Sequence, residues 1–346
     1  MARTRAAIIN VTGYIGADIA RIVLRHPEVE LVCVTGRSAA GKRLAEVFPH
    51  FESSDLVIRP DIDVPVDVVF SAMPHKASAE ACRPLVAQGL RVIDVSADFR
   101  LKSREEYEEW YQVEHPCPEL LDVAVYGLPE LHRDEVRSAR LVANPGCYPT
   151  GALLALAPAL SAGVTEGDII VDSKSGVSGA GRSLTLTTHF AECNESVSAY
   201  AVNGHRHLPE IRQECRRLNE RVTELLFVPH LIPMTRGILS SCYARVSDAW
   251  IGQHGDPGPA LQALYREFYK TSPFVKVVET PPATKHVWGS NYCHVFPKYD
   301  QRTGRLLVIS AIDNLVKGGA GEAVQNMNLM MGFDETCGLN ALPVYP

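Results

Sequence analysis

The sequence predicts an α/β protein: a Rossmann-type doubly wound parallel sheet, followed by an α+β domain with a mixed sheet. Apolar runs typical of buried strands alternate with helical patterns over about the first 150 residues, which indicates a parallel sheet wound with helices. The chain also opens with a strand, a glycine turn and a helix, the order that a dinucleotide-binding unit requires. After Leu160, strand-like runs follow one another with fewer helices between them, as in a mixed sheet.

Length and composition are typical of a globular protein with two domains. With 346 residues, the chain is longer than an ordinary domain built on one hydrophobic core. Its content of 46% hydrophobic and 21% charged residues is typical of a soluble protein. The net charge of −6 argues against nucleic acid as a partner, and the sequence shows neither a signal peptide nor a membrane-spanning run. Nine cysteines without a Cys-x-x-Cys pair indicate neither a disulfide framework nor a metal site. We expect a cytoplasmic protein with free thiols that acts on a small molecule.

The first strand and turn carry an incomplete dinucleotide fingerprint. Ala6–Asn10 is an apolar strand candidate, and the helical pattern that follows stops before Pro27. In the pattern Gly-x-x-Gly-x-x-Gly, Asn10 takes the first position, and Gly13 and Gly16 follow. Asn tolerates a positive φ, the second position lets the backbone approach a pyrophosphate, and the third lets helix and strand pack closely. The alternative is an ordinary strand–helix turn. Cofactor contacts are expected from Thr12, Gly13, Tyr14, Ile15 and Gly16.

The end of the second strand bears on the choice of cofactor. Val29–Thr35 is a near-continuous apolar run, as in a parallel sheet. An NAD-binding unit places Asp or Glu at this point to hold the ribose 2′-hydroxyl, whereas this chain has Gly36, Arg37 and Ser38. A cation there suits a 2′-phosphate, so the sequence favours NADP(H), bound near Thr35, Arg37 and Ser38. The alternative for Arg37 is a solvated loop charge.

Apolar periodicity predicts the remaining elements. In the first domain we expect strands over Asp67–Ala72, Val92–Val95 and Leu141–Ala143, a helix over Ala77–Ala87, an acidic surface helix within Lys102–His115, and a strand with a loop over Val123–Arg133. In the second domain we expect strands over Asp168–Ser173, Glu224–His230, Gly237–Val246, Phe274–Val278 and Arg305–Ile312, with helices over Pro209–Leu218 and Gln262–Tyr269. The glycine turn and apolar-faced helix of Gly318–Gly332 are expected to dock on the first domain. The predicted domains are therefore 1–147 with 318–346, and 148–317.

One cysteine stands where a thiol becomes reactive. The strand at Leu141–Ala143 ends in the turn Asn144-Pro145-Gly146, and Cys147 follows directly. The next residues, up to Leu160, carry no charge and are typical of a buried helix. Unpaired N–H groups and the helix dipole at such a position favour a thiolate. The alternative is a small apolar residue buried in a tight turn.

Two further segments carry groups suited to chemistry. Ser175–Arg182 combines small residues, hydroxyls and a cation, which favours an anion-binding concavity over a flexible loop. His205 and His207 precede a helix that begins near Pro209, and in an extended segment they point the same way. A histidine at such a position tends to stay neutral and act as a base, and a metal pair is disfavoured because no other ligands cluster. Together with the cysteine and the dinucleotide domain, these groups predict hydride transfer to or from an acyl group bound to Cys147.

Four motifs resemble those of the N-acetyl-γ-glutamyl-phosphate reductases, NADP-dependent enzymes of arginine biosynthesis. The motifs are NPGCYPT, SGVSGAGR, GHRHLPEI and DNLVKGGAGEAVQNMNLMMG, and the resemblance runs from Gly13 to Gly332. It implies a Rossmann domain joined to an α+β domain like that of the aspartate-semialdehyde and glyceraldehyde-phosphate dehydrogenases. Asn10 departs from the family, which normally has glycine there.

The resemblance also implies roles for single residues. Cys147 is the nucleophile, and His205 and His207 are acid/base and substrate-binding groups. Which histidine is the acid/base stays open, with His207 favoured because it lies closer to the helix. The turn with Pro74 and His75 matches a loop that closes over the nicotinamide. Further cofactor contacts are expected from Ser178, Gly179 and Asn314, and substrate contacts from Arg100, Asn144, Ser175, Arg182, His205 and Glu210.

The expected reaction begins with attack of the Cys147 thiolate on an acyl phosphate. Phosphate leaves, NADPH delivers hydride to the thioester, and a histidine protonates the product as the semialdehyde departs. One alternative is a related enzyme that acts on a carrier-linked glutamyl or aminoadipyl phosphate, and the lack of a basic rim beyond Arg182 disfavours it. Another is an NADP-binding protein without chemistry, which the intact cysteine and histidines disfavour. Apolar strands in the second domain favour a homodimer or homotetramer.

Overall fold

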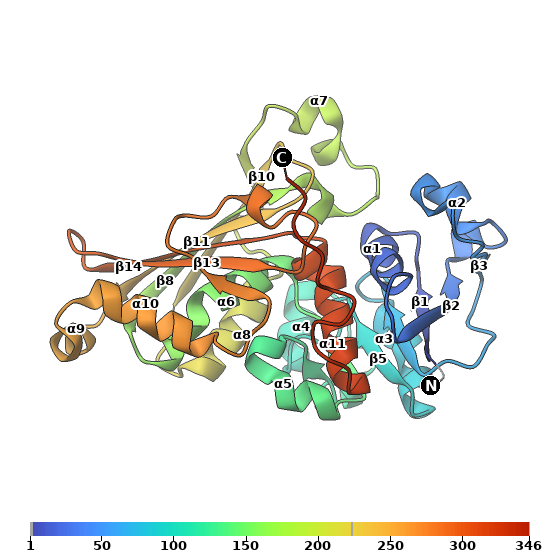
Figure 1. The fold of residues 1–346 in the computed structure, drawn as a ribbon, viewed down its shortest axis with the longest axis horizontal. Coiled ribbons are helices and arrows are strands. Elements are labelled where there is room, and N and C mark those ends of the chain that lie inside the picture. Colours follow the sequence, from blue (N-terminus) through green and yellow to red (C-terminus); the bar gives the residue numbers. More distant parts are fainter. Residues whose placement is uncertain (1–2, 223, 346) are drawn as a thin grey trace. The chain divides into compact units, whose positions relative to one another are not determined.

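A computed structural model describes residues 3–222 and 224–345, which form two compact units (Figure 1). The first unit combines the chain up to Gly146 with Gly319–Ala341, and the second combines Cys147–Gly318 with the residues from Leu342 onward. The predicted domain limits differ from these units at Cys147 and Gly318, which both belong to the second unit, and at residues 342–345. This last segment packs with the second unit because the N–H of Val344 donates to the carbonyl of Trp288 at 2.8 Å.

A seven-stranded parallel sheet forms the first unit and confirms the predicted doubly wound class. Its order is β3-β2-β1-β4-β5-β7-β6, and all neighbouring strands are parallel. The order reverses between β1 and β4, and ligands of such sheets bind at the carboxyl ends of the strands beside that reversal. The strands are β1 (Thr4–Ile9), β2 (Val29–Thr35), β3 (Ile58–Arg59), β4 (Val68–Ser71), β5 (Arg91–Asp94), β6 (Val125–Tyr126) and β7 (Leu141–Ala143).

The C-terminal helix returns to this first unit, as predicted. It packs on α1, α5 and β5, and it is the red helix beside the green α5 in Figure 1. The helices of the unit are α1 (Tyr14–Val23), α2 (Leu44–Val47), α3 (Ser78–Ala87), α4 (Arg104–Tyr111), α5 (Pro129–Ser138) and α11 (Gly321–Met331).

Two segments of the first unit differ from the prediction. The run Val123–Arg133 is not only strand and loop, because Pro129 begins α5; this helix is polar and is kinked at His132, where φ is −130°, so its pattern is weak. The acidic helix α4 is not purely a surface element. Its Tyr107 and Tyr111 are buried, with ring centroids 4.7 Å apart, and they anchor one face of the helix in the core.

The second unit is built on a seven-stranded mixed sheet, which confirms the predicted class. Its order is β12-β13-β14-β11-β8-β10-β9, with parallel pairs β12–β13 and β8–β10 and antiparallel pairs elsewhere. The prediction missed β9 and also β13, in which Pro297 interrupts the strand pattern. The strands are β8 (Thr165–Gly176), β9 (Ser198–Ala199), β10 (Leu225–Ile232), β11 (Ile238–Val246), β12 (Val275–Val277), β13 (Cys293–Asp300) and β14 (Arg305–Ile312).

A buried helix, α6 (Cys147–Ser161), forms the centre of this unit's core. It packs on β8, β11, β13 and β14, and its residues from Tyr148 to Leu160 are all buried. The hydroxyls of Tyr265 and Tyr269 donate to the carbonyls of Ala155 and Leu154 at 2.8 and 2.6 Å, so the uncharged helix is also held by polar contacts. The other helices are α7 (Phe190–Cys193), α8 (Leu208–Leu218), α9 (Asp248–His254) and α10 (Pro257–Phe268).

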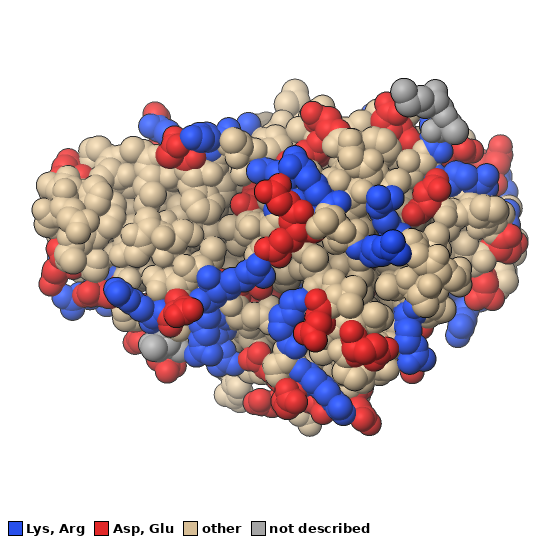
Figure 2. Space-filling view, turned by 90° about the horizontal axis from the view of Figure 1, so that it is seen from below, with Lys and Arg blue, Asp and Glu red and all other residues tan. Residues whose placement is uncertain are grey.

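On the face shown in Figure 2, charges of both signs are interspersed over the middle and right of the view, whereas the left part carries charges mainly along its rim. Among the described residues, every helix is too short or too polar to cross a bilayer.

Candidate active site

Cys147 is the first residue of α6, whereas the sequence predicted it in the turn just ahead of this helix. It is half-buried, whereas the turn before it and the helix after it are buried. The N–H groups of a first helical turn lack partners within the helix, and together with the helix dipole they favour negative charge at this place. A thiolate, or the oxyanion formed when it attacks a carbonyl, is stabilised by such groups.

Both predicted histidines lie against the residue that follows the cysteine. The ring of Tyr148 contacts His205 and His207 edge-on, with centroid distances of 5.6 and 5.8 Å. The two histidine rings are 4.8 Å apart, and the N–H of His207 donates to Nδ1 of His205 at 3.1 Å. The second unit therefore brings together the neighbourhood of the cysteine and the HRH motif, which are about 60 residues apart in the sequence.

Aromatic side chains that the sequence reasoning missed surround His205. Tyr200 and Phe227 lie 5.5 and 5.4 Å from its ring, and the hydroxyl of Tyr200 donates to that of Tyr148 at 3.0 Å. Burial, and then the charge of Arg206, lower the pKa of His205 to about 4. The imidazole is therefore neutral at pH 7, and the main cause is desolvation rather than the helix position that the sequence suggested. Only the place of Tyr148 next to the cysteine could have signalled this arrangement.

The predicted anion segment meets the predicted cofactor asparagine. Nδ2 of Asn314 donates to Oγ of Ser178 at 3.0 Å, and its Oδ1 accepts the N–H of Gly237 at 2.7 Å. Ser175 and Ser178 are buried, and Gly179 is exposed on the short helical turn Val177–Ala180. One direct hydrogen bond, from Asn314 to Ser178, thus joins two of the four motifs.

The two charged residues expected to bind substrate lie in different surroundings. Arg182 is exposed in the loop that follows the turn, and Glu210 is buried in the first turn of α8. Their roles in substrate binding stay predictions.

The glycine turn of the first unit has the predicted backbone. Asn10 has φ of 62°, which confirms the expected positive φ at the first position of the fingerprint. Its Nδ2 donates to the carbonyl of Ala72 at 2.8 Å and its Oδ1 accepts the hydroxyl of Thr12, so the ends of β1 and β4 are tied together. A Cβ at Gly16 would lie 2.6 Å from the Asn10 carbonyl oxygen, which confirms the close packing predicted there. A Cβ at Gly13 would meet no atom within 4 Å.

Other predicted cofactor residues also lie at the carboxyl ends of the strands. Arg37 and Ser38 are exposed directly after β2, whereas Thr35 is buried and its Oγ1 accepts the N–H of Asn10 at 3.4 Å. After β4, Pro74 is exposed, and Nδ1 of His75 accepts the N–H of Ala97 at 2.9 Å. Tyr14 and Ile15 form the first turn of α1.

Asn144 and Arg100, both expected to touch substrate, contact each other. Nε of Arg100 donates to the main-chain carbonyl of Asn144 at 2.8 Å. Asn144 is fully buried; its Nδ2 donates to the carbonyl of Gly319 at 3.1 Å, and its Oδ1 accepts Nδ2 of Asn326 at 3.1 Å. Both ends of this amide thus bond to the chain, and the substrate contacts expected of Asn144 and Arg100 stay predictions.

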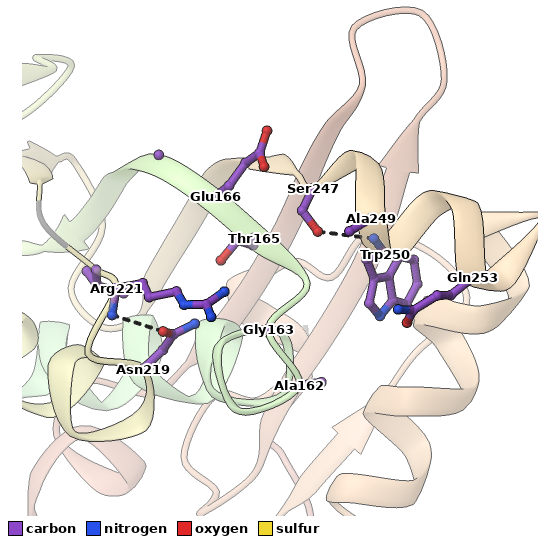
Figure 3. A pocket seen from close by; sticks show the side chains of 12 residues that line it. Ala162, Gly163, Thr165, Glu166, Asn219, Arg221, Ser247, Ala249, Trp250 and Gln253 are labelled. Atoms are coloured by element: carbon purple, nitrogen blue, oxygen red, sulfur yellow. Dashed lines mark hydrogen bonds between the residues drawn. The ribbon is translucent and has the colours of Figure 1, made fainter.

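A hollow of about 370 Å³ in the second unit lies away from this chemistry (Figure 3). It opens beyond the C-terminal end of α6, where Asn219, Arg221, Trp250 and Gln253 line it. A helix of 15 residues is roughly 20 Å long, so Cys147 lies at the far end of α6. Within the described part of the chain, no group of three or more His, Cys, Asp or Glu is arranged to hold a metal ion.

Comparisons with known proteins agree with the two-domain fold. The model of the semialdehyde dehydrogenase NAD binding domain matches residues 5–139, and that of the semialdehyde dehydrogenase dimerisation domain matches residues 147–314. Aspartate semialdehyde dehydrogenase II of Vibrio cholerae, solved in complex with ASA, has the same fold, with a TM-score of 0.70 and 16% identity over 96% of this chain and 99% of that one.

Full-length relatives are far more similar in sequence. The chain is 51% identical to the N-acetyl-gamma-glutamyl-phosphate reductase of Dehalococcoides mccartyi over 100% of both proteins. It is 50% identical to that of Symbiobacterium thermophilum over 99% of both. The chain belongs to the N-acetyl-gamma-glutamyl-phosphate reductase family.

Proposed function

We propose that this chain converts N-acetyl-L-glutamyl 5-phosphate and NADPH into N-acetyl-L-glutamate 5-semialdehyde, phosphate and NADP⁺ through a thioester on Cys147, a step of arginine biosynthesis. The observation that carries the proposal is the half-buried cysteine at the first residue of α6, next to the tyrosine on which two histidines pack. Membership of the family supports the choice of substrate.

The proposed reaction has two steps, formation of a thioester on Cys147 and reduction of this thioester. The Cys147 thiolate attacks the acyl carbon, N–H groups of the helix start stabilise the oxyanion, and the bond to phosphate breaks to leave the thioester. Bound NADPH supplies the hydride that reduces this thioester. A histidine gives its proton to the oxygen of the resulting thiohemiacetal and takes it back as the carbon–sulfur bond breaks, which releases the semialdehyde and regenerates the thiolate. His207 is the proposed acid/base, and the neutral, half-buried His205 orients it through Nδ1.

Two groups are proposed to hold the anionic parts of the ligands. Ser175, Ser178 and Arg182 bind the departing phosphate, because buried hydroxyls and an exposed guanidinium there provide donors. Arg37 binds the 2′-phosphate of NADPH. Among the described residues its side chain has no hydrogen bond or ion pair, so it is available to a ligand, and no carboxylate directly follows β2 to repel the phosphate.

The closing experiment measures phosphate-dependent reduction of NADP⁺ by the semialdehyde. Cys147→Ser is expected to abolish this activity and to leave NADPH binding, followed by its fluorescence, unchanged. Cys193→Ser is the matched control, because Cys193 is also half-buried and free. Substantial turnover by Cys147→Ser would rule out the covalent scheme.

We also propose that two copies of the chain associate through the second unit's sheet. Tyr243 pairs with Ile170 on one side and Leu307 on the other, and all three side chains are half-exposed on one face. An apolar row of this kind is typical of an interface between subunits. Tyr243→Glu places a charge on this face and is expected to weaken the association. The molar mass measured by light scattering should then fall below that of the wild-type dimer or tetramer. An unchanged mass would contradict this assignment of the face.

A further inference from the structure

The amide of Asn326 on α11 is an unusual feature of the first unit's core. The side chain is fully buried, and its Nδ2 donates twice, to the carbonyl of Gly127 at 2.8 Å and to Oδ1 of Asn144 at 3.1 Å. Within the described part of the chain, its Oδ1 has no hydrogen-bond partner. A buried hydrogen-bond acceptor without a partner lowers the stability of the fold. We therefore ask what the two hydrogen bonds donated by the same amide contribute.

That donor end acts on the turn before the cysteine. Asn144 is held from three further directions: its N–H donates to the carbonyl of Asp94 at 2.8 Å, its Nδ2 donates to Gly319, and its carbonyl accepts Arg100. Asn326 completes this set by fixing the remaining amide oxygen. Only Pro145 and Gly146, both buried, separate this held residue from Cys147.

The surroundings leave Asn326 little freedom to take another position. A Cβ at Gly127 would lie 2.4 Å from Cγ1 of Val142 and 2.6 Å from Nδ2 of Asn326. The absence of a side chain at this glycine is what allows the amide to reach Asn144. Val142 belongs to β7, the strand that leads into the turn, so the space that holds the Asn326 amide is bounded by this strand and by Asn144.

We infer that Asn326 is a positioning residue for the reaction, acting through Asn144 to hold the turn that presents Cys147. This rests on the proposed function, because it takes Cys147 as the nucleophile. A nucleophile must be held in an attack geometry, and a misplacement of about 1 Å lowers turnover by up to ~100-fold. The inference therefore predicts a loss in kcat and in thiol reactivity rather than in cofactor binding.

The test compares two asparagines of the same helix. Asn326→Ala is expected to lower kcat at least tenfold and to slow alkylation of Cys147 by iodoacetamide, followed by mass spectrometry of its peptide, by a similar factor. KM for the semialdehyde and the dissociation constant of NADPH are expected to change less than threefold. Asn328→Ala is the control: Asn328 is equally buried but bonds to His26, Glu335 and Cys337, not to Asn144, so kcat stays within threefold of the wild type.

A double-mutant cycle then checks the route of the effect. If Asn326 acts through Asn144, then Asn144→Ala combined with Asn326→Ala loses no more kcat than the larger single loss. Independent, multiplying losses would overturn the inference, and so would an Asn326→Ala enzyme with wild-type kcat or an equal loss in Asn328→Ala. Should Asn326→Ala not fold, Asn326→Ser takes its place in the same comparisons. An active Cys147→Ser enzyme would instead refute the proposed function, whatever Asn326→Ala does.

Discussion

Gly318 lies so close to Cys147 that a side chain does not fit between them: a Cβ on Gly318 would lie 2.8 Å from Cβ and 3.2 Å from Cα of the cysteine. Real Cβ atoms do not approach other atoms this closely, so one of the two backbones would have to move. Cys147 continues into a helix that is buried from Tyr148 to Leu160, and the N–H of Gly318 donates to the carbonyl of Asp313 at 2.9 Å. A glycine is therefore required at position 318 because the cysteine lies so close, and not because the backbone there adopts a positive φ.

Gly318→Ala is expected to displace Cys147 and to lower kcat at least tenfold, because a shift of the nucleophile by a fraction of an ångström already disturbs its attack geometry. Gly252→Ala on α9 is the matched control, since a Cβ there meets no atom within 4 Å and turnover is expected to stay unchanged. Steady-state kinetics measures both variants. Wild-type kcat in Gly318→Ala would mean that the two backbones separate without consequence for the thiol.

A second prediction concerns the acid side of stability. The pKa of His205 is about 4 in the folded chain, against 6.5 as its ordinary value, because burial disfavours the charged ring. Between these values the unfolded chain binds a proton that the folded chain does not, so this residue makes stability fall as pH drops from 6.5 to 4. The full effect is roughly 3 kcal/mol at pH 4 and below. Above pH 6.5 it vanishes.

His205→Gln removes this titrating group. As the pH falls from 6.5 to 4, the free energy of unfolding is therefore expected to decrease less in the variant than in the wild type. Urea unfolding at pH 4.5, 5.5 and 7.5 measures it. His254→Gln is the control, because His254 is exposed. A difference between the His205 variant and wild type that does not depend on pH would show that the ring titrates normally in the fold.

The sequence predicted the elements whose patterns are local. The limits of β2, β7 and β14 match the expected ones because each is a near-continuous apolar run bounded by turn or polar residues. The positive φ of Asn10 followed from its place in the glycine fingerprint, and the position of Cys147 from the turn before an uncharged run. In each case the information lies within about ten residues of the chain.

What escaped prediction depends on partners far away in the sequence. The bond between Asn326 and Asn144 spans 182 residues, and it depends on how α11 packs on its sheet rather than on any local pattern. The same holds for the rings that desolvate His205, since Phe227 comes from β10 and Tyr200 from the end of β9. Both residues are ordinary in sequence, and only tertiary packing gives them a role at the site.

A third prediction tests the choice of cofactor. Arg37→Asp is expected to raise KM for NADPH by about 10- to 100-fold, the range that corresponds to loss of a charge-assisted hydrogen bond, and to improve the use of NADH. The control is Arg91→Asp, because Arg91 is also exposed but begins β5 at the opposite, amino-terminal edge of the sheet. Steady-state kinetics with both cofactors gives the ratio of the two kcat/KM values. If Arg37→Asp leaves the ratio of kcat/KM for NADPH to that for NADH unchanged, another residue binds the 2′-phosphate.

The last prediction separates two glycines of one turn. Gly16→Ala would press a Cβ to 2.6 Å from the Asn10 carbonyl oxygen and 2.8 Å from Cα of Val11, both backbone atoms, so the free energy of unfolding is expected to fall by about 1–3 kcal/mol. At Gly13 the added Cβ meets no protein atom within 4 Å and φ is −83°, which alanine adopts without strain. Gly13→Ala is therefore expected to keep wild-type stability and to weaken NADPH binding at least tenfold, because the methyl group takes up the space that the pyrophosphate approaches. Urea unfolding and fluorescence titration with NADPH are measured on both variants. If the Gly13→Ala protein is stable and still binds NADPH with wild-type affinity, the pyrophosphate does not bind at this turn. This conclusion does not depend on the result for Gly16→Ala.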